Sequence, residues 1–202
     1  MTAVDATPRT GAVSDVISHA HDAIGSLHLH TGRLTSWAQL VHRSLRHGGL
    51  VLAAGNGGSA THADHLVGEL VGRFRRERLP QRAVSLVADH GTLTAVGNDY
   101  GFEEVFARQV NGLARPGDVV VLLSTSGRSR NLLRAAEDGC ARGATVLALT
   151  GPAPNPLATL ATDALCVDAP DTASIQDAHH VAVHALCAAI DELLPTTTEV
   201  TP

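Results

Sequence analysis

The sequence predicts an α/β fold, a three-layer sandwich in which helices flank a five-stranded parallel sheet, with additional helices at the N-terminus. Five short apolar segments of β type alternate along the chain with helical segments, which is the pattern of a parallel sheet with helical crossovers. The predicted strands cover residues 49–54, 83–87, 119–123, 145–149 and 164–167. Apolar residues recur at helical spacing from residue 13 to about residue 47, and Gly32 marks a break, so two N-terminal helices are expected.

The chain length favours a single domain with short tails. Its 202 residues are enough for one core of ordinary size without disulfides or a structural metal. Residues 1–13 are rich in threonine, alanine and proline, and residues 195–202 begin with a proline and a threonine run. Both segments are therefore expected to be disordered tails. One domain, which includes the N-terminal helical pair, is predicted for residues 14–194.

Composition narrows the class of partner. The formal net charge is −5 and all 15 basic residues are arginines mixed with acidic residues, so no polybasic face for nucleic acid or membrane lipid is expected. No apolar run reaches the roughly 20 residues that span a bilayer, which predicts a cytoplasmic protein. The lack of lysine excludes Schiff-base chemistry, and the three widely spaced cysteines are expected to be buried and reduced. A small molecule is the expected partner.

A glycine-rich loop follows the first predicted strand and opens a helix near Ala60. It covers residues 55–59 and reads Gly-Asn-Gly-Gly-Ser. Such a loop allows close backbone approach, and the free N–H groups of the helix N-terminus can bind an anion. Two other interpretations are possible. Ser59 could simply cap the helix, or the spacing of Gly55, Gly57 and Ala60 could be a dinucleotide-binding fingerprint. The fingerprint requires an acidic residue about 20 positions further on, whereas Asp89 lies about 30 positions further on.

A serine-rich loop follows the third predicted strand and also opens a helix. It covers residues 124–129 and reads Ser-Thr-Ser-Gly-Arg-Ser. Its hydroxyls, together with unpaired amides at a helix N-terminus, can satisfy the oxygens of a phosphate without a lysine. A capped serine-rich turn is the simpler alternative. Two anion-binding loops after strands of one sheet favour a phosphorylated ligand.

Two helices carry candidate metal ligands. His65 and Glu69 are four residues apart and share one helix face, a spacing at which two side chains can bind one metal ion, although an exposed helical hydrogen bond is the commoner use. On the last long helix, Gln176, His180 and His184 form a stripe, with His179 one position off it. Spacing alone does not choose between His180 and His184, nor does it exclude His62, one turn before His65.

Taken in order, these motifs resemble the SIS-domain sedoheptulose 7-phosphate (phosphoheptose) isomerases. The resemblance covers about residues 50–190. It depends on the loops at 55–59 and 124–129, the helix with His65 and Glu69 that ends in Glu-Leu-Val-Gly-Arg-Phe, the segment Gly-Asn-Asp-Tyr-Gly-Phe-Glu at 97–103, and the helix from Gln176 to His184.

The resemblance implies a ligand set for zinc, one ion per subunit, made of His65, Glu69, Gln176 and His184. The family's spacing of eight from glutamine to histidine selects His184 and leaves His180 at an ordinarily apolar position. We interpret His179 and His180 as structural. The residues implied to bind substrate are Asn56, Gly57, Gly58, Ser59, Glu69, Asn98, Asp99, Ser124, Thr125, Ser126, Ser129 and Gln176.

The implied activity is an aldose–ketose isomerisation of sedoheptulose 7-phosphate to D-glycero-D-manno-heptose 7-phosphate. Moving the carbonyl needs a base for a carbon-bound proton and an electrophile for the enediolate, and a metal can be that electrophile. By resemblance, Glu69 is the base and His184 serves the substrate oxygens as acid and base. The resemblance also implies a homotetramer with active sites between subunits.

Three alternatives belong to other classes of protein. The first is a non-catalytic SIS-domain protein that binds the replication initiator DnaA, and retention of Glu69 with the metal ligands argues against it. The second is a phosphosugar-sensing regulator, but no DNA-binding segment accompanies the domain. The third is a dinucleotide oxidoreductase, which leaves the loop at 124–129 without a role.

Overall fold

The computed structural model describes residues 10–195. Its strands are β1 (Val51–Gly55), β2 (Ala83–Ser85), β3 (Val119–Ser124), β4 (Thr145–Thr150) and β5 (Asp163–Cys166). Its α-helices are α1 (Thr10–Ser26), α2 (Thr31–Arg46), α3 (Gly58–Val71), α4 (His90–Tyr100), α5 (Ala107–Leu113), α6 (Arg130–Ala141), α7 (Pro156–Leu160) and α8 (Thr172–Leu193). Two 3-10 turns, η1 (Leu27–His30) and η2 (Phe102–Glu104), complete the order of elements in that range.

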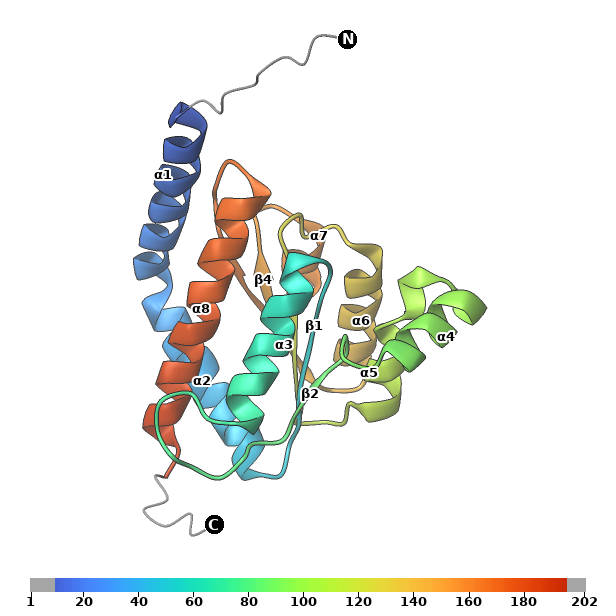
Figure 1. Ribbon diagram of the computed structural model, residues 1–202. Coiled ribbons are helices and arrows are strands. Elements are labelled where there is room, and N and C mark those ends of the chain that lie inside the picture. The colour runs from blue at the N-terminus through green and yellow to red at the C-terminus, as the bar shows by residue number, and fades with distance from the viewer. Residues whose placement is uncertain (1–9, 196–202) are drawn as a thin grey trace.

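The sheet is parallel throughout, with the strand order β2-β1-β3-β4-β5 (Figure 1). Val51 lies opposite Val119, and Val119 opposite Thr145, so the three central strands start in line. Every residue of β1 and β3 is buried. Strands covered on both faces need apolar side chains in both directions, which explains the continuous apolar runs in the sequence. The predicted fold class is confirmed.

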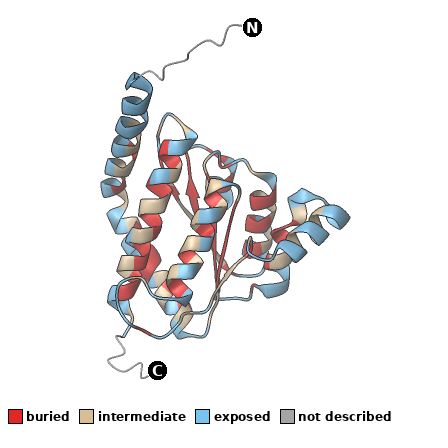
Figure 2. Cartoon of the chain, viewed as in Figure 1, coloured by how far each residue is buried: buried red, intermediate tan, exposed pale blue. Residues whose placement is uncertain are grey.

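Two hydrophobic cores lie on opposite faces of the sheet. Helices α1, α2, α3 and α8 cover one face, and α5, α6 and α7 cover the other. Side chains of one strand divide between the two cores, since Val121 belongs to the first and Leu122 to the second. Figure 2 shows the buried residues concentrated where the helices face the strands. The result is the predicted three-layer arrangement.

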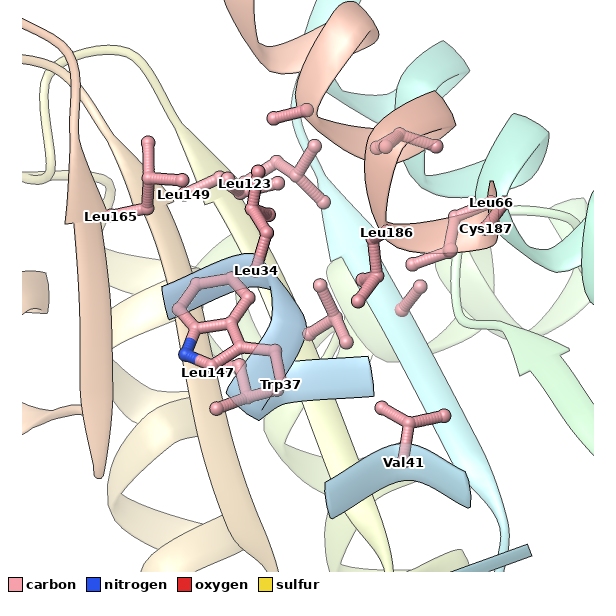
Figure 3. Close-up of a cluster of buried hydrophobic side chains, with 14 of the residues drawn as sticks. Leu34, Trp37, Val41, Leu66, Leu123, Leu147, Leu149, Leu165, Leu186 and Cys187 are labelled. Atoms are coloured by element: carbon pink, nitrogen blue, oxygen red, sulfur yellow. The ribbon is translucent and has the colours of Figure 1, made fainter. Parts of the chain in front are cut away.

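The N-terminal helices are part of this packing. Trp37 of α2 is buried in the first core, beside Leu147 of the sheet (Figure 3). Its indole Nε1 donates a hydrogen bond of 2.7 Å to Asp163 Oδ2, and Arg33 Nε reaches the same oxygen at 3.2 Å. A buried indole needs such an acceptor for its N–H. The Trp37–Asp163 contact therefore fixes α2 against the edge strand β5.

The predicted N-terminal boundaries differ from the observed ones. The break between the two helices is the 3-10 turn Leu27–His30, and Gly32 lies in the first turn of α2. Glycine destabilises mainly the middle of a helix, through backbone entropy, and Gly32 lies at the start of α2. Helix α1 begins at Thr10, so the disorder predicted for residues 1–13 is wrong for residues 10–13. The rest of that tail and residues 196–202 lie outside the described part of the chain.

Strand ends and cysteines also differ in detail. The predicted strands 49–54 and 83–87 are shorter or shifted, because β1 begins at Val51 and the edge strand β2 ends at Ser85. Strands β3 and β4 each continue one residue further, where Ser124 pairs with Thr150. Of the cysteines, Cys187 is buried but Cys140 is exposed on α6, which corrects the expectation of three buried thiols. None of the helices within residues 10–195 is long and apolar enough to cross a membrane.

Candidate active site

The strand order reverses between β1 and β3. From β1 the chain continues to β2 on one side, whereas β3 is followed by β4 and β5 on the other. In parallel sheets, ligands bind beyond the carboxyl ends of the strands at such a switch point. The loops that follow β1 and β3 are the glycine-rich and serine-rich loops singled out in the sequence. The fold therefore brings the two predicted anion-binding loops to one place.

The glycine-rich loop lets helix α8 approach the backbone closely. Gly57 has φ of +55°, a conformation that favours glycine. A Cβ at Gly58 would lie only 2.6 Å from the side-chain Oε1 of Gln176. The Gln176 amide therefore lies directly against the start of α3, where the glycine-rich loop was predicted to bind substrate. Ser59 is buried, and its N–H donates to the carbonyl of Asn56 at 3.0 Å.

The serine-rich loop turns tightly around Gly127, which has φ of +60°. Ser124 Oγ accepts from the Gly127 N–H at 3.2 Å and lies 3.3 Å from Ser129 Oγ. Ser126 Oγ accepts from the Arg128 N–H at 3.2 Å. Ser129 precedes α6 but its side chain does not cap the helix, so the first amides of α6 are left for an anion. Thr125 is half-buried beside them.

A reciprocal pair of amides joins the two loops. Asn56 Nδ2 donates to Asn131 Oδ1, and Asn131 Nδ2 donates to Asn56 Oδ1, both at 2.9 Å. Asn131 is buried in the first turn of α6. Asn131 was not predicted as a site residue, since an asparagine two residues past a serine-rich loop gives no distinctive signal. The pair fixes the orientation of Asn56, whose side chain was predicted to bind substrate.

An imidazole cluster lies between α3 and α8, which pack side by side (Figure 1). His65 Nε2 lies 2.8 Å from His184 Nε2 and 3.3 Å from Glu69 Oε1. The ring of His180 stacks on His65 with a centroid distance of 4.9 Å, and meets His184 edge-on at 4.5 Å. The structure thus unites the predicted residues His65, Glu69 and His184, and adds His180, which had been interpreted as structural.

The donor set of this cluster fits a divalent metal ion. One ring nitrogen from each of His65, His180 and His184 lies within 4.8 Å of the others, and the Glu69 carboxylate lies 3.3 Å from His65 Nε2. Imidazole nitrogens and a carboxylate oxygen are the ligands that zinc accepts in proteins. The cluster is half-buried rather than sealed, so a substrate could reach it.

His179 and His62 have other surroundings. His179 is fully buried and its Nε2 lies 3.1 Å from the carbonyl oxygen of Thr150. Burial lowers its pKa to about 4, so this imidazole is neutral; the structural interpretation holds for His179. The ring of His62 packs on His180 at 5.0 Å, and burial, then the neighbouring His180, lower the pKa of His62.

Asn98 and Asp99 lie apart from the imidazole cluster. Both are exposed near the end of α4, where Asn98 Nδ2 donates to Asp99 Oδ1 at 2.8 Å. Helix α4 is at the opposite side of the molecule from α8 (Figure 1). A single chain therefore does not bring these two predicted substrate-binding residues to the other site residues.

Arg78 is a second residue that was not predicted from the sequence. Its guanidinium donates to the carbonyl oxygens of Glu69 and Leu70 at the end of α3, at 2.6 and 2.9 Å. It also pairs with Asp191 of α8 at 3.0 Å. Several arginines occur in this segment, and nothing in the sequence distinguishes Arg78 from the others. In the structure it ties the end of the helix that carries Glu69 to α8.

A model of the SIS domain family matches residues 15–151, which is more than half of the chain. A solved structure of a phosphoheptose isomerase from Neisseria gonorrhoeae superposes with a TM-score of 0.79 and 38% identity, covering 90% of this chain and 96% of that one. Its fold matches the sheet and the N-terminal helices described above. The protein is thus an SIS-domain protein in fold, with an imidazole cluster between α3 and α8 and two predicted anion-binding loops that follow β1 and β3.

Curated relatives define the family more narrowly. A phosphoheptose isomerase of Streptomyces coelicolor is 50% identical over 182 residues, which cover 89% of this chain and 79% of the relative. A phosphoheptose isomerase of Bordetella avium is 46% identical and covers 92% of this chain and 98% of the relative. The chain belongs to the phosphoheptose isomerase family of SIS-domain proteins, and is therefore a sugar-phosphate isomerase. An enzyme of this kind is favoured over the non-catalytic, sensing and dinucleotide-binding alternatives.

Proposed function

We propose that this enzyme converts sedoheptulose 7-phosphate to D-glycero-D-manno-heptose 7-phosphate. One observation carries the proposal: His65 Nε2 lies 3.3 Å from Glu69 Oε1 and 2.8 Å from His184 Nε2. His65 and Glu69 are on α3, which starts in the glycine-rich loop, and His184 is on α8. The names of the relatives support the choice of a heptose phosphate. The reaction moves a carbonyl between C2 and C1 of the sugar.

In this proposal the two loops at the switch point hold the substrate. Ser124, Thr125, Ser126, Ser129 and the free amides of α6 bind the phosphate, which suits an enzyme without lysine. The glycine-rich loop, with Asn56 held by Asn131, binds the sugar. Gln176 lies against Gly58 and contributes a side-chain amide to the same site.

The proton transfers are assigned to two side chains. Glu69 takes the proton from C1 of the ketose, which leaves an enediolate across C1 and C2, and the proton returns to C2. His184 moves a proton between the two substrate oxygens as the carbonyl changes place. His65 Nε2 lies 2.8 Å from His184 Nε2, so the two imidazoles face the same point between α3 and α8.

The proposed metal is one Zn²⁺ per subunit, held by His65, Glu69, Gln176 and His184. Bound there, it would act as a Lewis acid that polarises the carbonyl and stabilises negative charge on the enediolate. The contacts of His65 with Glu69 and His184 support this proposal for three of the four ligands, and Gln176 lies on the same helix as His184. Other first-row divalent ions accept the same ligands, so the identity of the ion is part of the test.

The proposed assembly is a homotetramer with active sites between subunits. Helix α1 exposes Val16 and Ile17, at 55% and 65% of their surface, and exposed apolar side chains along one helix are typical of an interaction surface. A neighbouring subunit would also supply Asn98 and Asp99, which are distant from the imidazole cluster within one chain. Sedimentation of the purified protein measures the number of subunits.

The proposed activity is tested by metal removal. We expect the purified enzyme to lose turnover of sedoheptulose 7-phosphate after chelation and to regain it on addition of Zn²⁺. Magnesium serves as the control ion, since it prefers oxygen ligands and retains its waters. Undiminished turnover by the chelated enzyme would contradict the proposed need for a metal ion. No turnover by the folded, zinc-loaded enzyme would contradict sedoheptulose 7-phosphate as the substrate.

A further inference from the structure

Helix α8 presents Gln176, His180 and His184 along one stripe. At a rise of about 1.5 Å per residue, the outer two are about 12 Å apart along the helix axis. A zinc ion lies only about 2.0–2.2 Å from each nitrogen or oxygen ligand. An ion bound by both Gln176 and His184 would therefore lie over position 180, midway between them. The imidazole of His180 must then either bind the ion or obstruct it.

The position of the His180 ring decides between these alternatives. It stacks on His65 at an interplanar angle of 26° and meets His184 at 70°. The nitrogens of the three rings lie within 4.8 Å of one another. In a tetrahedral zinc site with Zn–N distances of 2.0–2.1 Å, neighbouring nitrogens are about 3.3 Å apart. Small rotations of the side chains would bring the three rings onto one ion.

Gln176 has a different environment. Its amide touches the start of α3, where a Cβ at Gly58 would lie 2.6–2.8 Å from the amide atoms. Gly58 belongs to the glycine-rich loop, and Gln176 is about two helical turns from His184 along α8. The same side chain can donate and accept hydrogen bonds to a sugar hydroxyl. A ligand role for His180 leaves Gln176 available for that contact.

We infer that His180 is a metal ligand, so that this enzyme holds its ion with three imidazoles, from His65, His180 and His184, together with the Glu69 carboxylate. The inference rests on the proposed metal site and changes its ligand set. Three nitrogen donors favour zinc, cobalt or nickel over the oxygen-seeking magnesium. His62 packs against the ring of His180 and lies outside the group of three converging nitrogens.

The test compares His180→Phe with His62→Phe, because phenylalanine keeps a ring in each place and removes the nitrogens. The metal-stripped proteins are titrated with Zn²⁺ in competition with a chromogenic chelator, and X-ray absorption of the zinc-loaded proteins counts the imidazoles. We expect three imidazoles in the wild type and two in His180→Phe, with Zn²⁺ affinity lowered by more than about tenfold. His62→Phe should retain three imidazoles and near wild-type affinity.

The outcomes separate this inference from the proposed function. If His180→Phe retains the imidazole count and affinity of the wild type, His180 is not a ligand, while the proposed metal stands. If the folded wild type binds no zinc, cobalt or nickel, both are wrong. Far-UV circular dichroism of the stripped proteins establishes that each variant is folded, and His180→Ala repeats the measurement if phenylalanine is not accommodated.

Discussion

Arg78 and Asp191 form an ion pair of 3.0 Å whose side chains are only 3% and 4% exposed. Asp191 Oδ2 also accepts from the backbone N–H groups of Arg75 and Arg76, at 3.0 and 3.3 Å. Arg78 in turn donates to the carbonyl oxygen of Glu69. The pair thus connects the end of α8, the segment after α3 and the helix that carries the proposed base.

Breaking this pair is expected to destabilise the fold. Arg78→Met leaves the Asp191 carboxylate buried without its partner, which should lower the free energy of unfolding by about 3–5 kcal/mol. The matched control is Arg76→Met, since Arg76 pairs with Glu192 at the surface, where the side chains are 43% and 67% exposed; it should change stability by less than about 1 kcal/mol. Urea unfolding measures both. Equal effects of the two substitutions would contradict the account.

The same carboxylate should make stability depend on pH. Burial raises the pKa of the Asp191 carboxyl. The hydrogen bond from the Arg75 N–H and the Arg78 guanidinium together lower it by more, so the net pKa lies below its ordinary value. A lowered folded-state pKa contributes stability above the unfolded pKa of about 3.9, and this contribution is lost as the pH falls through the folded pKa. The stability difference between wild type and Asp191→Asn should therefore shrink below about pH 4. A constant difference from pH 6 to pH 3 would refute this.

Gly58 should be intolerant of a side chain. In Gly58→Ala the new Cβ would displace the Gln176 amide, which lies 2.6 Å away, and we expect kcat/KM to fall by about 10–100-fold. Gly68→Ala is the control on the same helix, because its Cβ would meet nothing within 4 Å. That substitution should preserve activity and stabilise the helix by about 0.5–1 kcal/mol. Steady-state kinetics that rank the two variants equally would count against the role of the Gly58–Gln176 contact.

Asn131 should act through Asn56. Asn131→Ala removes both bonds of the reciprocal pair and leaves the Asn56 amide free to turn away from the substrate. Leaving the half-buried Asn56 amide without these partners costs about 1–3 kcal/mol, so KM for the phosphosugar should rise by at least about tenfold. Initial rates over a range of substrate concentrations measure this. An unchanged KM would mean that Asn56 needs no support from Asn131.

The sheet and the loops could be predicted because they depend on local patterns. Continuous apolar runs report burial on both faces, and the glycine and serine loops directly follow two of those runs. Strand ends and the helix break were less accurate, since Gly32 is compatible with a helical first turn. The pairing of Ser124 with Thr150 depends on a neighbouring strand.

The missed residues act through contacts between distant segments. Asn131 pairs with a residue 75 positions away, and Arg78 with one 113 positions away, and neither contact has a periodicity that a sequence can reveal. The sequence placed His180 on one helical stripe with Gln176 and His184. Its approach to His65 follows from the packing of α3 against α8, which spacing along one helix does not specify.

The proposed chemistry is tested most directly by isomerisation of sedoheptulose 7-phosphate in D₂O, followed by NMR, with wild type and Glu69→Gln side by side. We expect the wild type to form the aldose with deuterium at C2, because the proton held by Glu69 exchanges with solvent before it returns. The Gln variant, folded and without a base, should be slower by at least about 10²–10⁴-fold. Turnover by Glu69→Gln at the wild-type rate would contradict the assignment of Glu69 as the base.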